Sequence, residues 1–244
     1  MKPLALCVIS IQLCLSAFCQ NNFVTITGHI KGLQPGEWVY YEKKVGGSEA
    51  DSAATQDGGF AFRIMVPRNG GNEYMLRIGK SIENAKPVVL LYLEKGNVTI
   101  ESEDTSFQNV SCKGPQSLED YQNWCQMRIQ FMHSEEADSV YAKRMKLELT
   151  NDIEGLATLQ LAIKRADSLG LILDTQWVHQ HRTSPISAYV LYENQSNLSP
   201  EELETEMNSL PAISKNNVFA DYITSFINEK IHDASVGTTA AGFT

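Results

Sequence analysis

The sequence lacks the short motifs that most commonly mark an enzyme active site. It holds five cysteines but no Cys-x-x-Cys pair, the spacing that lowers a thiol pKa in disulfide oxidoreductases. It also has no Gly-x-Ser-x-Gly, no phosphate-binding P-loop and no dinucleotide-binding fingerprint. We therefore expect no catalytic residue and no cofactor in this chain.

Basic residues and long apolar runs are also scarce. There are 20 Lys and Arg against 29 Asp and Glu, a net charge of −9. This acidity argues against a nucleic-acid partner, whose phosphates require basic side chains. No apolar stretch after the first 19 residues is long enough for a membrane span, which needs about 20 residues.

Residues 1–19 are expected to form a signal peptide. Lys2 provides a positive start, Leu4 to Leu15 is mostly apolar, and Ala17-Phe18-Cys19 fits a cleavage site before Gln20. A lipoprotein anchored at Cys19 is the less favoured alternative, because Phe18 is large for that motif. We expect a periplasmic or cell-envelope protein.

Two cysteines remain after this cleavage, Cys112 and Cys125. An oxidising compartment permits a disulfide between them. They are either two half-buried thiols or one structural bridge that joins a strand to a helix. A regulatory disulfide between the two is a third hypothesis for their role.

The apolar pattern changes near Gly114. In residues 20–114 it has period two, with frequent glycine-rich turns, and it predicts about eight short strands in an antiparallel β-sandwich. Asp57-Gly58-Gly59 predicts a hairpin, because these residues accept positive φ. The apolar run Val88 to Leu93 predicts a central strand covered on both faces. The expected strands lie at 23–31, 38–41, 51–55, 60–66, 74–78, 88–93, 98–100 and 107–113.

Residues 115–232 have the helical period, so the fold class is α+β with an all-helical segment after the sandwich. Ser199-Pro200 with Glu202 predicts a capped helix start, and Ser184-Pro185 predicts another with Ser184 or Ser187 as the cap. We expect the helices to pack closely on the sandwich. They are expected near 118–132, 140–149, 153–173, after 184, after 199 and at 217–231.

Trp38, Tyr40 and Tyr41 place aromatic side chains on both faces of one expected strand. One interpretation is that they pack the sandwich against the helices. The other is a docking surface for a peptide or protein. Tyr121, Trp124 and Trp177 are further aromatic candidates from the helical segment.

The histidines and acidic pairs are not expected to form a metal or acid–base site. His179 and His181 are two residues apart, so on a helix they point in different directions. The pairs Glu135/Glu136 and Glu201/Glu202 are expected on exposed helical turns.

Three blocks in residues 20–114 resemble an uncharacterised β-sandwich domain that precedes the thioredoxin-like domain in secreted TlpA/ResA-like (AhpC/TSA-related) bacterial thiol:disulfide oxidoreductases. The first holds Phe23, Ile26 and Gly28, the second runs from Asp51 to Phe62, and the third from Leu93 to Ile100. Residues 233–244 are similar to the linker and start of the thioredoxin-like domain: Val236-Gly237, Ala240 and Phe243 match, whereas Ala241 and Gly242 stand where Pro and Asp are usual.

This resemblance implies a non-catalytic N-terminal region that docks a substrate or mediates dimerisation for a redox domain bearing Cys-x-x-Cys. The alternative is a stand-alone envelope module that binds a peptide, a glycan or a protein, which the departures at Ala241 and Gly242 favour. The expected partners are envelope proteins or peptides, and a second copy of the chain is a further candidate.

Overall fold

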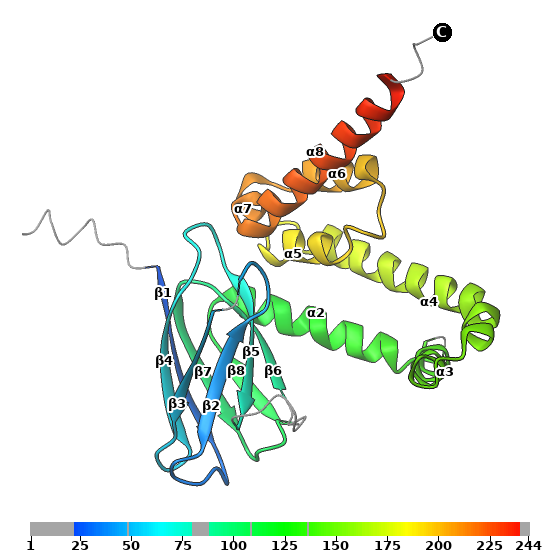
Figure 1. The fold of residues 1–244 in the computed structure, drawn as a ribbon. Coiled ribbons are helices and arrows are strands. Elements are labelled where there is room, and N and C mark those ends of the chain that lie inside the picture. Colours follow the sequence, from blue (N-terminus) through cyan, green and yellow to red (C-terminus); the bar gives the residue numbers. More distant parts are fainter. Residues whose placement is uncertain (1–21, 48, 80–87, 108, 136, 240–244) are drawn as a thin grey trace, which may run out of the picture.

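The computed structural model describes residues 22–47, 49–79, 88–107, 109–135 and 137–239, with the backbone alone from residue 232 onward (Figure 1). The expected signal peptide and residues 240–244 lie outside these ranges. Within them, eight strands form two four-stranded sheets, and seven helices follow. The protein is therefore α+β, with a strand-rich part before a helical segment, as predicted.

The two sheets have the orders β4-β1-β7-β8 and β3-β2-β5-β6. Neighbouring strands are antiparallel except for β1 and β7, which run parallel. The first sheet contains β1 (Phe23–Ile30), β4 (Gly59–Met65), β7 (Gly96–Ser102) and β8 (Val110–Lys113). The second contains β2 (Trp38–Lys43), β3 (Ala50–Ala54), β5 (Asn72–Ile78) and β6 (Val88–Leu93).

The sandwich core lies between the sheets and follows the period-two pattern of the sequence. Alternate side chains of each long strand point inward, because successive residues of a strand face opposite sides. Burial of these apolar side chains is the main stabilising contribution to this part of the fold. The inward side chains include Val24, Ile26 and Ile30 from β1, Phe60, Phe62 and Ile64 from β4, and Val39, Leu76 and Leu91 from the other sheet.

The Asp57-Gly58 turn has the predicted geometry but does not join two paired strands. Asp57 and Gly58 have φ angles of 50° and 76°, and the turn closes with a single bridge between Gln56 and Gly59. Beyond that bridge β3 pairs with β2 and β4 pairs with β1, so the turn carries the chain from one sheet to the other. The predicted two-residue turn is therefore present, but the flanking strands do not continue as a paired hairpin, because a turn signal does not identify their partners.

β6 is an edge strand, not the central strand that its apolar run suggested. Val89, Leu91 and Leu93 face the sandwich core, whereas Tyr92 on the other face packs into a second core formed by the helices. Helical cover over part of the outer face therefore explains an apolar run at a sheet edge.

The helices begin directly after β8. They are α2 (Gln116–Met132), α3 (Asp138–Leu149), α4 (Ile153–Gln180), α5 (Ile186–Glu193), α6 (Pro200–Ser209), α7 (Ala212–Lys215) and α8 (Val218–Thr239). In the part of the chain that the structure describes, none of them combines the length and apolar character that a membrane crossing requires.

Of the two predicted helix starts, the one at Ser199 is confirmed and the one at Ser184 differs. The Ser199 side chain accepts from the Glu202 amide and the Glu202 side chain accepts from the Ser199 amide, so the predicted capping box is present. At α5 the N-cap is Pro185 and no side-chain cap bond is present, so the prediction of Ser184 or Ser187 as the cap was wrong, although the Ser184 hydroxyl accepts from the Ile186 amide at 3.2 Å. α8 continues to Thr239, eight residues beyond the expected end of the last helix.

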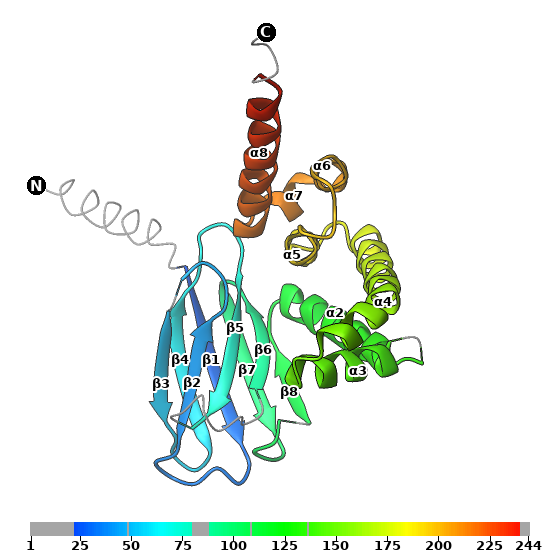
Figure 2. The same ribbon diagram turned by 45° about the vertical axis from the view of Figure 1, so that its right-hand side comes forward.

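α2 lies along one side of the sandwich, next to β6 and β8, and α8 extends away beyond the end of the sandwich (Figure 2). Leu118 of α2 packs into the sandwich core, and Tyr92 of β6 packs into the helical core. At a second contact Asn69, in the loop before β5, donates to Asp221 of α8 at 2.9 Å. Each core thus contains a side chain from the other part of the chain.

Candidate functional site

The three predicted docking aromatics separate onto two faces of β2. Tyr41 points into the sandwich core, edge-on to Phe62 with 5.1 Å between ring centroids. Trp38 and Tyr40 lie on the outer face of the β3-β2-β5-β6 sheet, half-buried, with ring centroids 6.4 Å apart. Tyr41 is therefore a core residue, and only Trp38 and Tyr40 stand at a surface.

The strand register extends this surface across the sheet. Tyr40 is paired with Arg77 of β5, whose guanidinium carbon lies 5.6 Å from the centre of the Tyr40 ring. Arg77 is paired in turn with Val88 of β6, and Met75 with Leu90. Val88 and Leu90 are 44% and 40% exposed. We call the six residues Trp38, Tyr40, Met75, Arg77, Val88 and Leu90 the outer-sheet patch.

The same sheet face is buried at its other end. Glu73 of β5 is paired with Tyr92 of β6, and both side chains lie beneath the helices. The Tyr121 hydroxyl of α2 donates to Glu73 Oε1 at 2.7 Å. Burial raises the pKa of Tyr121 and of Tyr189 far above the usual value, and the neighbouring Glu73 adds to both. One sheet face therefore anchors the helices at one end and carries the outer-sheet patch at the other.

Cys112 and Cys125 are both free thiols in the structure, each half-buried. Cys112 of β8 packs at the edge of the sandwich core, and Cys125 of α2 packs at the edge of the helical core. Burial raises the pKa of each thiol to about 11, although hydrogen bonding with Gln122 and Tyr121, respectively, opposes the rise. Because the thiolate is the nucleophile, neither group is poised for disulfide exchange near neutral pH.

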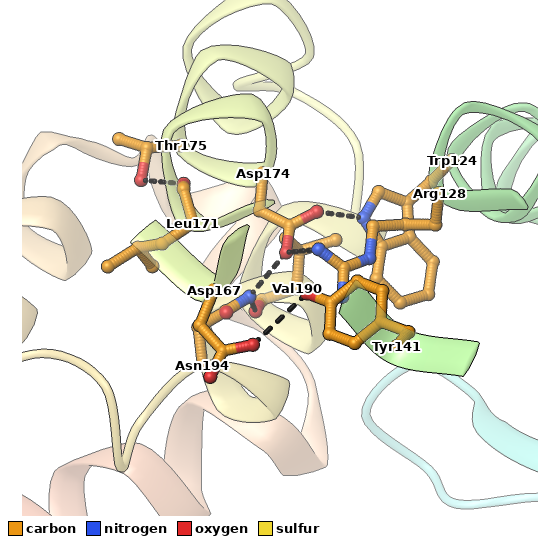
Figure 3. A network of polar contacts seen from close by, with 9 residues as sticks. All are labelled: Trp124, Arg128, Tyr141, Asp167, Leu171, Asp174, Thr175, Val190 and Asn194. Atoms are coloured by element: carbon orange, nitrogen blue, oxygen red, sulfur yellow. Dashed lines mark hydrogen bonds and ion pairs between the residues drawn. The ribbon is translucent and has the colours of Figure 1, made fainter. Parts of the chain in front are cut away.

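A buried polar network fixes the helices to each other (Figure 3). Asp174 of α4, with a side chain only 3% exposed, accepts from Trp124 Nε1 at 2.9 Å and from Asn194 Nδ2 at 2.9 Å. Arg128 Nη1 lies 3.2 Å from Asp174 Oδ2, the oxygen that also accepts from Asn194. Burial raises the pKa of Asp174, and Arg128 opposes that rise. The network thus joins α2, α4 and Asn194 at the C-terminal cap of α5, so its role is structural.

The two histidines near the end of α4 have separate partners. His179 Nε2 lies 2.9 Å from Glu206 of α6, whereas the His181 ring stacks on Trp177 with centroids 4.2 Å apart. Among the residues that the structure describes, no group of three or more His, Cys, Asp or Glu gathers to hold a metal ion.

A cavity of about 380 Å³ lies where the sandwich and the helices meet. Glu94, from the turn after β6, lines it together with Ser117 and Asp120 of α2 and Ser184 at the start of α5. Sequence reasoning missed this cavity, because its wall is assembled from segments that carry no common motif and lie far apart in the chain.

Comparison with known proteins identifies one part of the chain. Residues 24–121 match a family model described as "Domain of unknown function (DUF4369)". The match spans the strands of both sheets and continues into α2 as far as Tyr121, the residue that bonds to Glu73. A search of curated proteins finds no match to this chain. The sandwich and the first turns of α2 are thus a DUF4369 domain.

Proposed function

We propose that this chain is a non-catalytic binding region of a secreted thiol:disulfide oxidoreductase of the cell envelope, and that it docks a protein partner on the outer-sheet patch. The observation that carries the docking role is the outer-sheet patch itself. Trp, Tyr, Met and Arg are enriched at the centres of protein interfaces, and this patch contains one of each.

The base beneath this patch is rigid. Tyr41 anchors β2 in the sandwich core, and the Tyr121–Glu73 bond holds the other end of the same sheet face under α2. A preformed surface loses little conformational entropy on binding, which favours affinity. A protein partner seated on the patch would therefore be held in a defined orientation relative to the helices.

The redox context rests on sequence resemblance and on the thiols. The blocks around Gly28, Phe60 and Gly96 and the similarity of residues 233–244 to the start of a thioredoxin-like domain support it. With pKa values of about 11, Cys112 and Cys125 are unsuited to the exchange chemistry. That chemistry is assigned to a Cys-x-x-Cys on a thioredoxin-like domain, and this region positions the partner.

An insulin-reduction assay with dithiothreitol tests the non-catalytic assignment. The purified chain is expected to add nothing to the rate with dithiothreitol alone. Turnover that disappears in Cys112→Ser or Cys125→Ser would contradict the proposal.

The docking role is tested by site-specific photo-crosslinking in the native cell envelope. A p-benzoylphenylalanine at position 40 is expected to yield a discrete crosslinked species, and Leu90→Asp in the same chain should abolish it. The matched control places the crosslinker at exposed Thr25, on the outer face of the other sheet. Equal crosslinking from both positions would refute the outer-sheet patch as the docking surface.

A stand-alone envelope binding module is the second candidate function. The departures at Ala241 and Gly242 from the thioredoxin-like pattern favour it. An immunoblot of the native envelope separates the two candidates. A band larger than this chain by about 100–150 residues supports the redox protein, and a band at the size of this chain supports the module.

A further inference from the structure

The long helix α4 has apolar side chains on two opposite faces. The inner face, which packs against α2 and α3, carries the buried residues Leu159 and Ala166. The outer face carries Ile153, Leu161 and Ile172, which are 72%, 81% and 51% exposed. A helix that is apolar on every side is normally covered on every side. The outer face of α4 has that apolar character, but nothing in the described part of the chain covers these three residues.

Three further residues complete a continuous row on this outer face. They are Ala157, Lys164 and Ser168, and all three are exposed. With 3.6 residues per turn and a rise of 1.5 Å per residue, the row occupies an arc of about 100° and a length of about 28 Å. Figure 2 shows α4 at the outer edge of the helical segment. We call the six residues Ile153, Ala157, Leu161, Lys164, Ser168 and Ile172 the α4 stripe.

α6 covers the same side of α4 beyond the end of the stripe. Thr175, less than one turn after Ile172, lines a cavity together with Thr205 and other residues of α6. One turn further along, His179 Nε2 lies 2.9 Å from Glu206 Oε2 of α6. Within one copy of the chain, a helix therefore packs on the end of this face and leaves the stripe itself open.

The spacing of the α4 stripe is the same in both directions along the helix. Consecutive members are separated by 4, 4, 3, 4 and 4 residues. A half-turn about the midpoint of the stripe places Ile153 opposite Ile172. The same rotation places Ala157 opposite Ser168, two small residues that allow close approach. A two-fold contact needs this match, because each residue of one copy must meet its counterpart in the other. Steps of three and four residues also align side chains along one seam, as between the helices of a coiled coil.

The part of α4 that bears the stripe is electrically balanced, although the chain has a net charge of −9. Over the length of the stripe α4 carries two acidic residues, Glu154 and Asp167, and two basic residues, Lys164 and Arg165. Two copies of an acidic protein repel each other through most of their surfaces, but not through a neutral one. In the two-fold arrangement Lys164 lies opposite Leu161, and its aliphatic stem can cover that side chain while its ammonium group reaches solvent. The charge of this helix therefore suits a second copy of the same chain.

We propose that two copies of this chain associate through the α4 stripe, with the two α4 helices antiparallel about a two-fold axis at the midpoint of the stripe. The contact lies outside residues 24–121, the DUF4369 match, and uses no residue of the outer-sheet patch. It is therefore independent of the proposed docking role. A single pair of helices is a small interface, so we expect a dissociation constant in the micromolar range.

Sedimentation velocity of the purified chain at about 1–200 µM protein and about 0.15 M salt tests the association. The wild-type protein is expected to change from monomer to dimer across this range. Leu161→Glu is expected to raise the dissociation constant about tenfold or more, because the contact would bury a charge without a partner. Met145→Glu, at an exposed position of α3 outside the stripe, is the matched control and should associate as the wild type does. A wild-type protein that stays monomeric throughout, or an equal loss in both variants, would overturn the proposal.

Introduced cysteines test the antiparallel register. In a chain whose native cysteines are replaced by serine, Ala157→Cys combined with Ser168→Cys is expected to give a disulfide-linked dimer under mild oxidation. Either change alone should give monomer on a non-reducing gel, because the same position in the second copy would lie about 16 Å further along the helix, beyond the reach of a disulfide. The two positions are equally far apart within one chain, so an internal bridge cannot form. Efficient linkage through a single cysteine, or none through the pair, would refute the antiparallel contact. None of these outcomes bears on the proposed redox context or on the outer-sheet patch.

Discussion

Gly28 of β1 and Phe60 of β4 face each other across the first sheet, and the Phe60 ring occupies the space that a side chain at position 28 would need. Both residues belong to the sequence blocks that resemble the sandwich domain. The glycine is required because an adjacent aromatic ring lies over its Cα.

This contact predicts that Gly28→Ala destabilises the protein by about 1–3 kcal/mol, the usual cost of overpacking a core. Denaturant unfolding of the purified chain measures the change. In a Phe60→Leu background the same alanine should cost less, because the ring that it strikes is gone. An equal cost in both backgrounds would mean that some other feature of β1 requires glycine.

The sequence predicted features that depend on neighbouring residues. The inward rows of β1 and β4 follow from alternation, and the Ser199 capping box follows from a four-residue pattern. It did not predict the sheet to which β3 or β4 belongs, or that β6 lies at an edge, because strand pairing depends on distant partners. The Glu94–Asp120 cavity was missed for the same reason.

Slow alkylation is expected for both thiols. With pKa values of about 11, Cys112 and Cys125 should react with iodoacetamide at pH 8 more than about a hundredfold more slowly than a free cysteine of pKa about 8.5, because little thiolate is present. The rates should rise as the pH approaches 11. Mass spectrometry of tryptic peptides follows each cysteine separately.

The same experiment in denaturant, without a reductant, tests the disulfide hypotheses. Both cysteines are expected to be alkylated at once, since both are free in the structure. Thiols that react only after reduction would establish a Cys112–Cys125 bridge in the native protein.

Tyr121→Phe should weaken the junction between the sandwich and the helices. The change leaves the buried Glu73 carboxylate without the donor that now lies 2.7 Å away, at an expected cost of about 1–3 kcal/mol. Chemical denaturation is the measurement. Tyr141→Phe is the matched control, because its hydroxyl bonds to Asp167 at 3.0 Å on an exposed surface and its loss should cost at most about 0.5 kcal/mol. Equal losses would show that Glu73 is adequately solvated without Tyr121.

Asp174→Asn should destabilise the helical segment by about 2–3 kcal/mol at pH 7. Removal of one partner from a fully buried ion pair costs about 3–5 kcal/mol. We expect a smaller cost here because the Arg128 side chain is one-third exposed. The amide NH₂ of the new side chain would face the donors of Arg128 or Asn194, so one hydrogen bond becomes a repulsive contact. Asp167→Asn, an exposed carboxylate on the same helix, is the control and should change the unfolding free energy by less than about 0.5 kcal/mol.

The difference in unfolding free energy between wild type and Asp174→Asn should depend on pH, and this dependence reports the balance between burial and ion pairing at Asp174. Burial raises its pKa in the folded state above the unfolded value of about 3.9, so the folded protein holds the proton more tightly. This titration contributes stability that is fully present below the unfolded pKa and is lost as the pH rises through the folded pKa. The asparagine variant lacks this contribution. The gap in unfolding free energy between wild type and Asp174→Asn should therefore widen from pH 7 to pH 4. A gap that narrows would mean that Arg128, Trp124 and Asn194 together outweigh burial.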